Sequence, residues 1–341
     1  MNYIRNTKAL QEQGLISADD TDLLNRVAEK FQISLSPEVI KNIAEPEIRQ
    51  QYLPTKEELE IQEEELNDPI GDEKFTPVKG ITHRYPDRVL LKPLHTCNVY
   101  CRFCFRREKV GQADEILKQD ELENALNYIR ERQEVWEVIL TGGDPLSLSA
   151  DKLASILDQL EAIDHVKVIR IHTRIPLVAP EKISDELLKV LDREKALYMI
   201  LHCNSHKELS DNVCFGIKKL SRAGIPLLSQ SVLLKNINDS VEKLEKLFRS
   251  LVAIRVRPYY LHHPDLAQGT SHFRVSLEKG RQVTSELRKS LSGIAQPLYV
   301  LDVPGGLGKV PAGKEFIQAK DDKTWKIQTI HDTFVDYQDY L

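Results

Sequence analysis

The chain has 341 residues, which is enough for one large domain with an appendage or for two modest domains. Its apolar fraction of 41% and charged fraction of 29% are typical of a globular protein, and a net charge of −5 disfavours nucleic acid as the main partner. No apolar run approaches the roughly 18 residues that a membrane helix requires, and the N-terminus lacks the apolar core of a signal peptide. We therefore expect a cytoplasmic protein with reduced thiols.

The first part of the chain, residues 1–75, is polar and is interpreted as a helical N-terminal region. A helix is predicted to begin after Pro54, because Thr55 and Glu58 match a capping box. The acidic run 63–65 is interpreted as a solvated helix face without a functional signal.

From about residue 88, short apolar runs alternate with amphipathic stretches. The predicted strands are Val89–Pro93, Glu137–Thr141, Val166–His172, Leu197–His202, Pro226–Val232, Arg255–Leu261 and Pro297–Val303. The predicted helices between them include Glu121–Arg132, Ala150–Leu160, Asp211–Ala223 and Ser240–Leu251. Strand–helix repeats of about 30 residues are typical of a parallel sheet with right-handed crossovers. We predict an α/β fold with a partial (β/α)6-type barrel over residues 76–303 and a short C-terminal extension over 304–341.

Three cysteines, Cys97, Cys101 and Cys104, follow the first predicted strand. Three thiolates can hold an iron–sulfur cluster and leave one iron free to bind and reduce a second cofactor. The alternative is a zinc knuckle with His95 as the fourth ligand. Structural zinc sites usually bring their ligands in two separated pairs, and this sequence has no second pair, so the cluster is favoured.

Polar residues follow the carboxyl end of each predicted strand, the edge at which α/β barrels build their active sites. Besides the cysteines they are Thr141–Pro145, Thr173, Arg174, His202–Asn204, Gln230, Ser231, His262, His263, Asp265 and Asp302. Any one of them alone is equally well explained as a satisfied polar residue at a strand end. Together they predict that one site is assembled from all of these strands.

Two glycine-rich segments lie among these strand ends. Gly142, Gly143 and Asp144 could let the backbone approach a ligand closely, although a tight turn explains the segment equally well. The second segment, Pro304–Lys309, is not a phosphate-binding loop, because neither Ser nor Thr follows the lysine. Lys309 could be a Schiff-base nucleophile or an ordinary surface lysine.

Together, these segments resemble the lysine 2,3-aminomutase family of radical S-adenosylmethionine enzymes over residues 70–312. The matching motifs are Thr76–Arg88, Cys97–Arg107, Gly142–Pro145, Gln230–Leu234, Arg257–Tyr260, His272–Arg274 and Pro304–Lys309. The resemblance implies a partial barrel, a [4Fe–4S] cluster, S-adenosylmethionine and pyridoxal phosphate. It also implies an isomerase that moves the amino group of L-lysine from carbon 2 to carbon 3.

The resemblance further implies roles for individual residues. The cluster would be bound by Cys97, Cys101 and Cys104, and pyridoxal phosphate by Lys309, with its phosphate near Arg88 and Arg84. The amino group of S-adenosylmethionine would contact Gly142, Gly143 and Asp144, and its nucleoside would lie near Gln230 and His202. The substrate α-carboxylate would be bound by Arg106. The distal ammonium of the substrate would be bound by Asp265 and Asp302. Two carboxylates suit the cationic side chain of lysine, which would otherwise be buried unpaired.

Other functions stay open at this point. They are β-lysine formation dedicated to modifying elongation factor P, an aminomutase for another amino acid such as glutamate, a radical enzyme acting on RNA, and a zinc-stabilised binding protein.

The expected partners are a one-electron donor, such as flavodoxin or ferredoxin, and further copies of the chain in a homo-oligomer. No cysteine follows Cys214, so we expect no structural zinc. The tail is predicted to form a hairpin of Glu315–Lys320 and Thr324–Ile330.

Overall fold

The computed structural model describes residues 2–111 and 116–340. The chain begins with four short helices: α1 (Thr7–Glu12), α2 (Thr21–Lys30), α3 (Pro37–Lys41) and α4 (Pro46–Tyr52). Asn6 and Ser36 cap α1 and α3, because their side-chain oxygens accept backbone N–H groups of the first turn. Tyr52 at the end of α4 is buried in the same hydrophobic core as the barrel strands, so the helices pack directly against the barrel.

The segment between α4 and the barrel differs from the sequence prediction. The helix predicted after Pro54 is a single 3-10 turn, η1 (Lys56–Leu59), in which Glu58 accepts the backbone N–H of Thr55 at 2.8 Å. Residues 60–66 form no helix. The interpretation of run 63–65 as a solvated helix face is wrong for Glu65, which is buried and forms an ion pair with Arg274. Contacts with the barrel therefore override the local helical preference.

Nine strands form one sheet in strict sequence order from β1 to β9. Seven of them, β2 to β8, run parallel, and β1 and β9 pair antiparallel at the two edges. Their bounds are β1 Ile81–Tyr85, β2 Arg88–Leu94, β3 Glu137–Gly142, β4 Val168–Thr173, β5 Ala196–His202, β6 Leu227–Val232, β7 Arg257–His262, β8 Leu298–Val303 and β9 Gly308–Pro311. All seven predicted strands, and the partial barrel that they imply, are confirmed.

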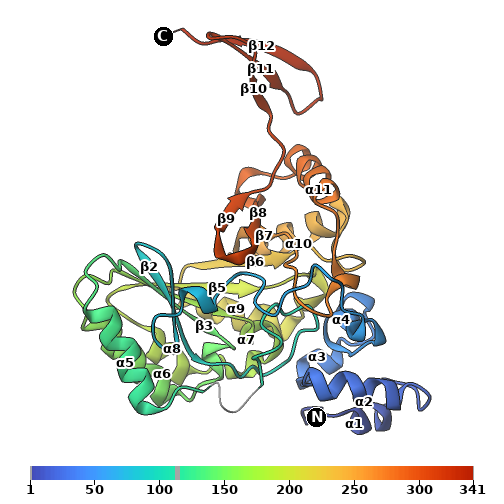
Figure 1. Ribbon diagram of the computed structural model, residues 1–341, viewed down its shortest axis with the longest axis vertical. Helices are drawn as coiled ribbons and strands as arrows, with labels where there is room; N and C mark the ends of the chain where they lie inside the picture. The colour runs from blue at the N-terminus through green and yellow to red at the C-terminus, as the bar shows by residue number, and fades with distance from the viewer. Residues whose placement is uncertain (1, 112–115, 341) are drawn as a thin grey trace.

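Helices connect the parallel strands and cover the outside of the curved sheet (Figure 1). They are α5 (Gln119–Arg130), α6 (Ala150–Glu161), α7 (Ile175–Val178), α8 (Asp185–Leu191), α9 (Asp211–Arg222), α10 (Val241–Ala253) and α11 (Leu277–Ser290). In α6, for example, Leu153, Ile156, Leu157 and Leu160 are buried, so one apolar stripe at helical spacing faces the sheet. The strands carry the matching apolar side chains of one continuous core.

The two edge strands of the barrel approach each other at one contact. The backbone N–H of Lys309 on β9 donates to the hydroxyl of Tyr85 on β1 at 2.9 Å. Gly308 has a φ of +99°, and a Cβ there would lie 3.3 Å from the same hydroxyl. A glycine is therefore needed for β9 to approach β1 with this backbone geometry. The barrel is nearly closed at this seam.

The C-terminal residues form a separate three-stranded antiparallel sheet that stands away from the barrel (Figure 1). Its strands are β10 (Ile317–Ala319), β11 (Thr324–Gln328) and β12 (Phe334–Gln338). The predicted hairpin is confirmed as β10 and β11, whereas β12 was not predicted. Within the described residues, no helix is long and apolar enough to cross a membrane.

Candidate active site

A cavity of about 700 Å³ lies at the carboxyl ends of the parallel strands. Residues from β2 to β9 and the loops that follow them line it, as the sequence predicts. The predicted site residues in its lining are Arg84, Arg88, Cys97, Cys101, Cys104, Arg106, Gly142, Gly143, Asp144, His202, Gln230, Asp265, Asp302 and Lys309. The structure therefore brings the whole predicted set together around one space.

The cysteine loop after β2 packs closely against the glycine-rich segment after β3. A Cβ on Gly143 would lie 2.4 Å from the carbonyl oxygen of Thr96, and one on Gly142 would lie 2.4 Å from that of Leu94. The backbone N–H of Gly143 donates to Leu94 at 2.7 Å. These glycines are thus required by close approach of the cysteine loop, a reason that the sequence did not reveal.

Burial shapes the chemistry of the three thiols. It raises the pKa of Cys97 and of Cys104, and it raises that of Cys101 to about 11. Among the described residues, no three Cys, His, Asp or Glu side chains are placed to hold a single metal ion. Thiolates that bind separate irons of a cluster need not converge on one point.

Asp144 is held by the strand ends around it. Its carboxylate accepts the Thr173 hydroxyl at 2.7 Å and the backbone N–H groups of Leu146, Arg174 and Ile175 at 3.1, 2.6 and 3.2 Å. Burial raises its pKa, although these hydrogen bonds act in the opposite direction. The carboxylate therefore fixes the ends of β3 and β4 relative to each other.

Arg106 and Arg84, two of the three predicted anion-binding arginines, share a buried carboxylate. Asp72 accepts the Nε and Nη2 of Arg106 at 3.1 and 2.8 Å, and the Nη2 of Arg84 at 3.2 Å. Lys92 lies 3.6 Å from the same carboxylate. Burial would raise the pKa of Asp72, but the surrounding cations outweigh it and lower the pKa to about 2. Three cations against one carboxylate leave the cluster with two unmatched positive charges.

Arg88, at the start of β2, lies differently from Arg84. Its guanidinium stacks on the ring of Tyr85 at 3.8 Å and pairs with Asp87 at 2.7 Å. Both arginines line the cavity from the edge where β1 meets β9.

A compact polar cluster in the cavity lining is formed by Lys309 on β9, Asp302 on β8 and His262 at the end of β7. Lys309 forms an ion pair with the Oδ2 atom of Asp302, and the Nδ1 atom of His262 lies 3.2 Å from that oxygen and 3.5 Å from the Nζ atom of Lys309. Burial would raise the pKa of Asp302, but its contact with His262 and the charge of Lys309 lower it. Asp302 is therefore an ionised carboxylate at neutral pH.

Asp265 lies near this cluster without a partner of its own. It forms no hydrogen bond or ion pair with any residue that the structure describes. Burial and the negative charge of Asp302 raise its pKa to about 7. A buried carboxylate of this kind is ready to bind a cationic group that enters the cavity.

The far side of the cavity is lined by imidazoles and amides. Gln230 lies 2.8 Å from the Nε2 atom of His202, whose ring packs edge-on against that of His172 at 5.9 Å between centroids. Burial lowers the pKa of His202 to about 3 and lowers that of His172 well below its usual range, so both rings are neutral. Neutral imidazoles can donate or accept hydrogen bonds with a neutral ring such as a nucleobase.

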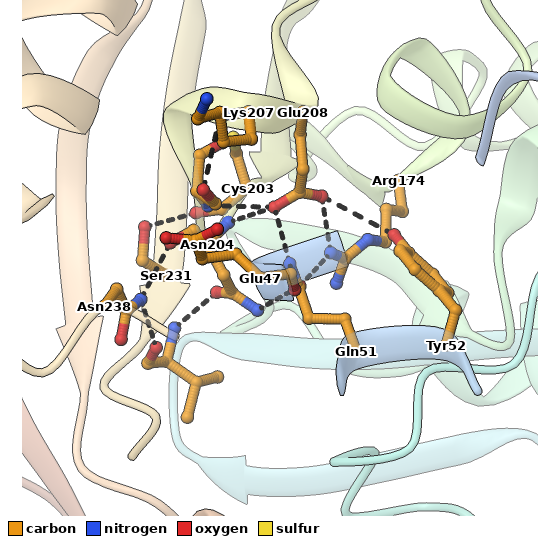
Figure 2. Close-up of polar contacts among 12 residues, drawn as sticks. Glu47, Gln51, Tyr52, Arg174, Cys203, Asn204, Lys207, Glu208, Ser231 and Asn238 are labelled. Carbon is orange, nitrogen blue, oxygen red and sulfur yellow. Dashed lines mark hydrogen bonds and ion pairs between the residues drawn. The ribbon is translucent and has the colours of Figure 1, made fainter. Parts of the chain in front are cut away.

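A buried polar network anchors helix α4 to the strand ends below the cavity (Figure 2). Arg174 donates to Gln51 and to Glu208, both at 2.6 Å. Glu208 also accepts the backbone N–H groups of Asn204 and Ser205 at 2.7 and 2.9 Å. Because Arg174 also lines the cavity, this network ties the N-terminal helices to the site.

Comparison with known proteins agrees with this geometry. The model of the radical SAM superfamily matches residues 91–249. The L-lysine 2,3-aminomutases of Fusobacterium nucleatum and Methanococcus maripaludis are each 37% identical to this chain, covering 93% of it and 75% of their own length. A glutamate 2,3-aminomutase of Clostridioides difficile is 34% identical, covering 96% of this chain and 80% of that protein.

The chain belongs to the lysine 2,3-aminomutase family. It is accordingly a radical S-adenosylmethionine isomerase, and the predicted family and enzyme class are confirmed. The predicted cofactor set of a [4Fe–4S] cluster, S-adenosylmethionine and pyridoxal phosphate is the set of this family. The chain offers groups that fit it: three thiols, a lysine amine, two arginines and buried imidazole nitrogens of His172 and His262 that lack protein partners among the described residues.

Four residues of this aminomutase site were not predicted or were given no role: Asp72, Arg174, Glu208 and His262. Arg174 and His262 carried a signal, because each follows a predicted strand. Asp72 and Glu208 carried no recognisable local pattern, since their partners are distant in sequence: the Gln51–Glu208 contact, for example, joins residues 157 positions apart.

We predict that Glu208→Gln destabilises the protein by about 3–5 kcal/mol, because it leaves the buried Arg174 guanidinium without its counter-charge. The measurement is the free energy of unfolding from urea denaturation. Glu242→Gln is the matched control, since Glu242 pairs only with Lys246 on the exposed face of α10, and it should cause no measurable change. Equal effects of the two substitutions would contradict the assignment.

Proposed function

We propose that this chain is an L-lysine 2,3-aminomutase. The observation that carries the proposal is the pair of partly buried carboxylates, Asp265 and Asp302, in the same cavity as Lys309. A substrate with a cationic side chain would complete the charge balance of this pair. A substrate with a second carboxylate would face repulsion there.

The other end of the cavity carries positive charge and therefore suits an anion. We propose that Arg106 binds the substrate α-carboxylate and that Arg84 and Arg88 bind the cofactor phosphate. The two unmatched positive charges around Asp72 favour anions in this region. An amino acid with a cationic side chain would thus lie with its carboxylate near Arg106 and its side chain near Asp265.

The remaining roles follow from the same arrangement. Cys97, Cys101 and Cys104 would hold the cluster, and Lys309 would hold pyridoxal phosphate. When bound, these groups supply an adenosyl radical and a carbonyl that can carry the migrating amino group. The residues of the chain would bind and orient the substrate, and the closed barrel would exclude water. Gly142, Gly143 and Asp144 would shape the S-adenosylmethionine site, with Gln230 and His202 beside its nucleoside.

The alternative of a glutamate substrate is disfavoured by charge. Although one relative is named a glutamate 2,3-aminomutase, Lys309 is the only lysine that lines the cavity among the described residues, and it pairs with Asp302. β-Lysine made here could serve elongation factor P modification, which would be a use of the same product.

The first prediction concerns turnover. Protein reconstituted anaerobically should convert L-lysine to β-lysine, and Asp265→Asn should reduce kcat/KM by at least about 100-fold, because the buried ammonium loses a counter-charge. Chromatography of the products measures the rate. Asp321→Asn, on the exposed tail, is the control and should leave it unchanged. Turnover of L-glutamate in preference to L-lysine would refute the substrate assignment.

The second prediction concerns pH. Because the pKa of Asp265 is raised to about 7, the carboxyl becomes neutral as the pH falls through that value and no longer attracts an ammonium. The Kd for L-lysine should therefore rise as the pH is lowered, by up to about tenfold per unit below the pKa. Isothermal titration calorimetry without S-adenosylmethionine measures binding alone. Asp265→Asn should bind weakly with a flat profile, and a flat profile in the unsubstituted protein would oppose the proposal.

We propose that the protein is a homo-oligomer in which a second copy covers one face of the tail sheet. Strand register places six apolar residues on that face: Ile317, Ala319, Trp325, Ile327, Val335 and Tyr337. The opposite face is mainly polar, and includes Gln318, Lys326 and Asp336. Val335 and Tyr337 are exposed in the single chain, and such a patch needs a partner.

The third prediction tests this assembly. Val335→Asp should reduce the mass measured by size-exclusion chromatography with light scattering, because it places a charge within the apolar face. Gln318→Asp adds the same charge to the polar face and should leave the mass unchanged. A chain that stops after Gly313 should behave like Val335→Asp. An unchanged mass for both altered proteins would exclude the tail sheet as the interface.

Three further expectations from the sequence belong to this proposal. We propose that the chain divides into a helical region (1–75), a barrel (76–303) and a lysine loop with extension (304–341), of which the last contributes the edge strand β9 to the barrel sheet. The protein would act in the cytoplasm and would receive its electron from a carrier such as flavodoxin or ferredoxin.

A further inference from the structure

His262 has no role in the proposed function so far, although it is buried beside the reactive lysine. It ends β7, and its ring packs edge-on against Tyr260 at 5.6 Å between centroids. Its Nδ1 atom faces both Asp302 and Lys309, and its Nε2 atom is buried without a protein partner among the described residues. His263, the next residue, instead contacts the Tyr299 hydroxyl at 2.7 Å and does not line the cavity.

Lys309 is held as an ammonium by its ion pair with Asp302. An ammonium has no lone pair, so it must lose a proton before its nitrogen can attack a carbonyl carbon. Asp302 is poorly suited to take that proton, because its pKa is lowered well below the usual range. The charged and titratable groups around His262 are Asp302, Lys309, Tyr260 and the more distant His202 and His172.

We propose that His262 accepts the proton of Lys309 and so activates its amine, an inference that rests on the proposed attachment of pyridoxal phosphate to this lysine. Before the transfer, the His262 ring carries its proton on Nε2, and the Lys309 ammonium lies beside both the Nδ1 lone pair and Asp302. The proton moves from Nζ to Nδ1. The amine is then neutral, the imidazole is an imidazolium, and no net charge enters or leaves the cluster.

The geometry stabilises both states. After the transfer, the Nδ1–H group of His262 donates to the Oδ2 atom of Asp302, which lies 3.2 Å away and has just lost the ammonium as its partner. The carboxylate is therefore paired with a cation before and after the step. Burial lowers the pKa of His262, so the ring is neutral at neutral pH and has a free lone pair, and the contact with Asp302 favours the imidazolium that the transfer forms. The neutral amine then forms a C=N bond with the carbonyl, and the carbonyl oxygen leaves as water.

The test is the rate at which the cofactor-free protein reacts with pyridoxal phosphate. Absorbance follows the reaction, and borohydride reduction followed by mass spectrometry locates the adduct on Lys309. His262→Gln should slow the reaction by about 100-fold at neutral pH, because glutamine keeps a polar contact but cannot accept the proton. The final amount of adduct should be unchanged, since a proton acceptor alters the rate and not the equilibrium. His263→Gln is the matched control and should react at the normal rate.

Two further measurements separate proton transfer from a structural role. In His262→Ala, imidazole added to the solution should restore part of the rate, and the rate without imidazole should rise steadily with pH as the amine loses its proton to water. A rate for His262→Gln within about twofold of normal would overturn the role, and so would slow reaction without rescue by imidazole. If the unsubstituted protein forms no reducible adduct on Lys309, the proposed cofactor attachment itself fails.

Discussion

The site depends on one electrostatic constraint: a carboxylate taken into the barrel must meet a cation or, as Asp144 does, several hydrogen-bond donors. Asp72 meets three, Glu208 meets Arg174, and Asp302 meets Lys309. Asp265 meets none among the described residues, and its raised pKa is the physical consequence. The folded chain thus carries a charge imbalance that a cationic ligand would remove. Substrate choice and pH dependence follow from that one imbalance.

The same constraint explains why the N-terminal region is part of the site. Two residues that precede the barrel strands contact arginines that line the cavity. Gln51 from α4 contacts Arg174, and Asp72, which lies between η1 and β1, contacts Arg106. A barrel made of residues from β1 onward would lack Asp72 beside Arg106 and Gln51 beside Arg174, although Arg174 would keep Glu208. The helices therefore act as supports for the charges at the strand ends.

Much of the fold was predictable, because it follows from periodicity. The strands of the barrel are apolar runs at regular spacing, and their polar ends converge wherever such strands run parallel. The site residues came from motifs, and the structure gathers all of them. The failures have a common cause: Glu65 looked solvated, but Arg274, 209 positions away, binds its carboxylate. Nothing local distinguishes such an acid from the exposed Glu64 beside it. The glycines at 142 and 143 were likewise noticed, but their role in admitting the cysteine loop needed the packed structure.

Lys309 lies on the last strand of the barrel, which pairs on one side with β8 and touches β1 through the Tyr85 hydroxyl. The tail sheet follows β9 after a short connection (Figure 1). The tail is therefore connected along the chain to the strand that bears the reactive nitrogen, and it also contacts α11 through the Lys289–Asp332 ion pair. Contacts between subunits that hold the tail in an assembly would therefore also restrain how far the Lys309 amine reaches into the barrel. Subunit association and the alignment of this amine would then be linked.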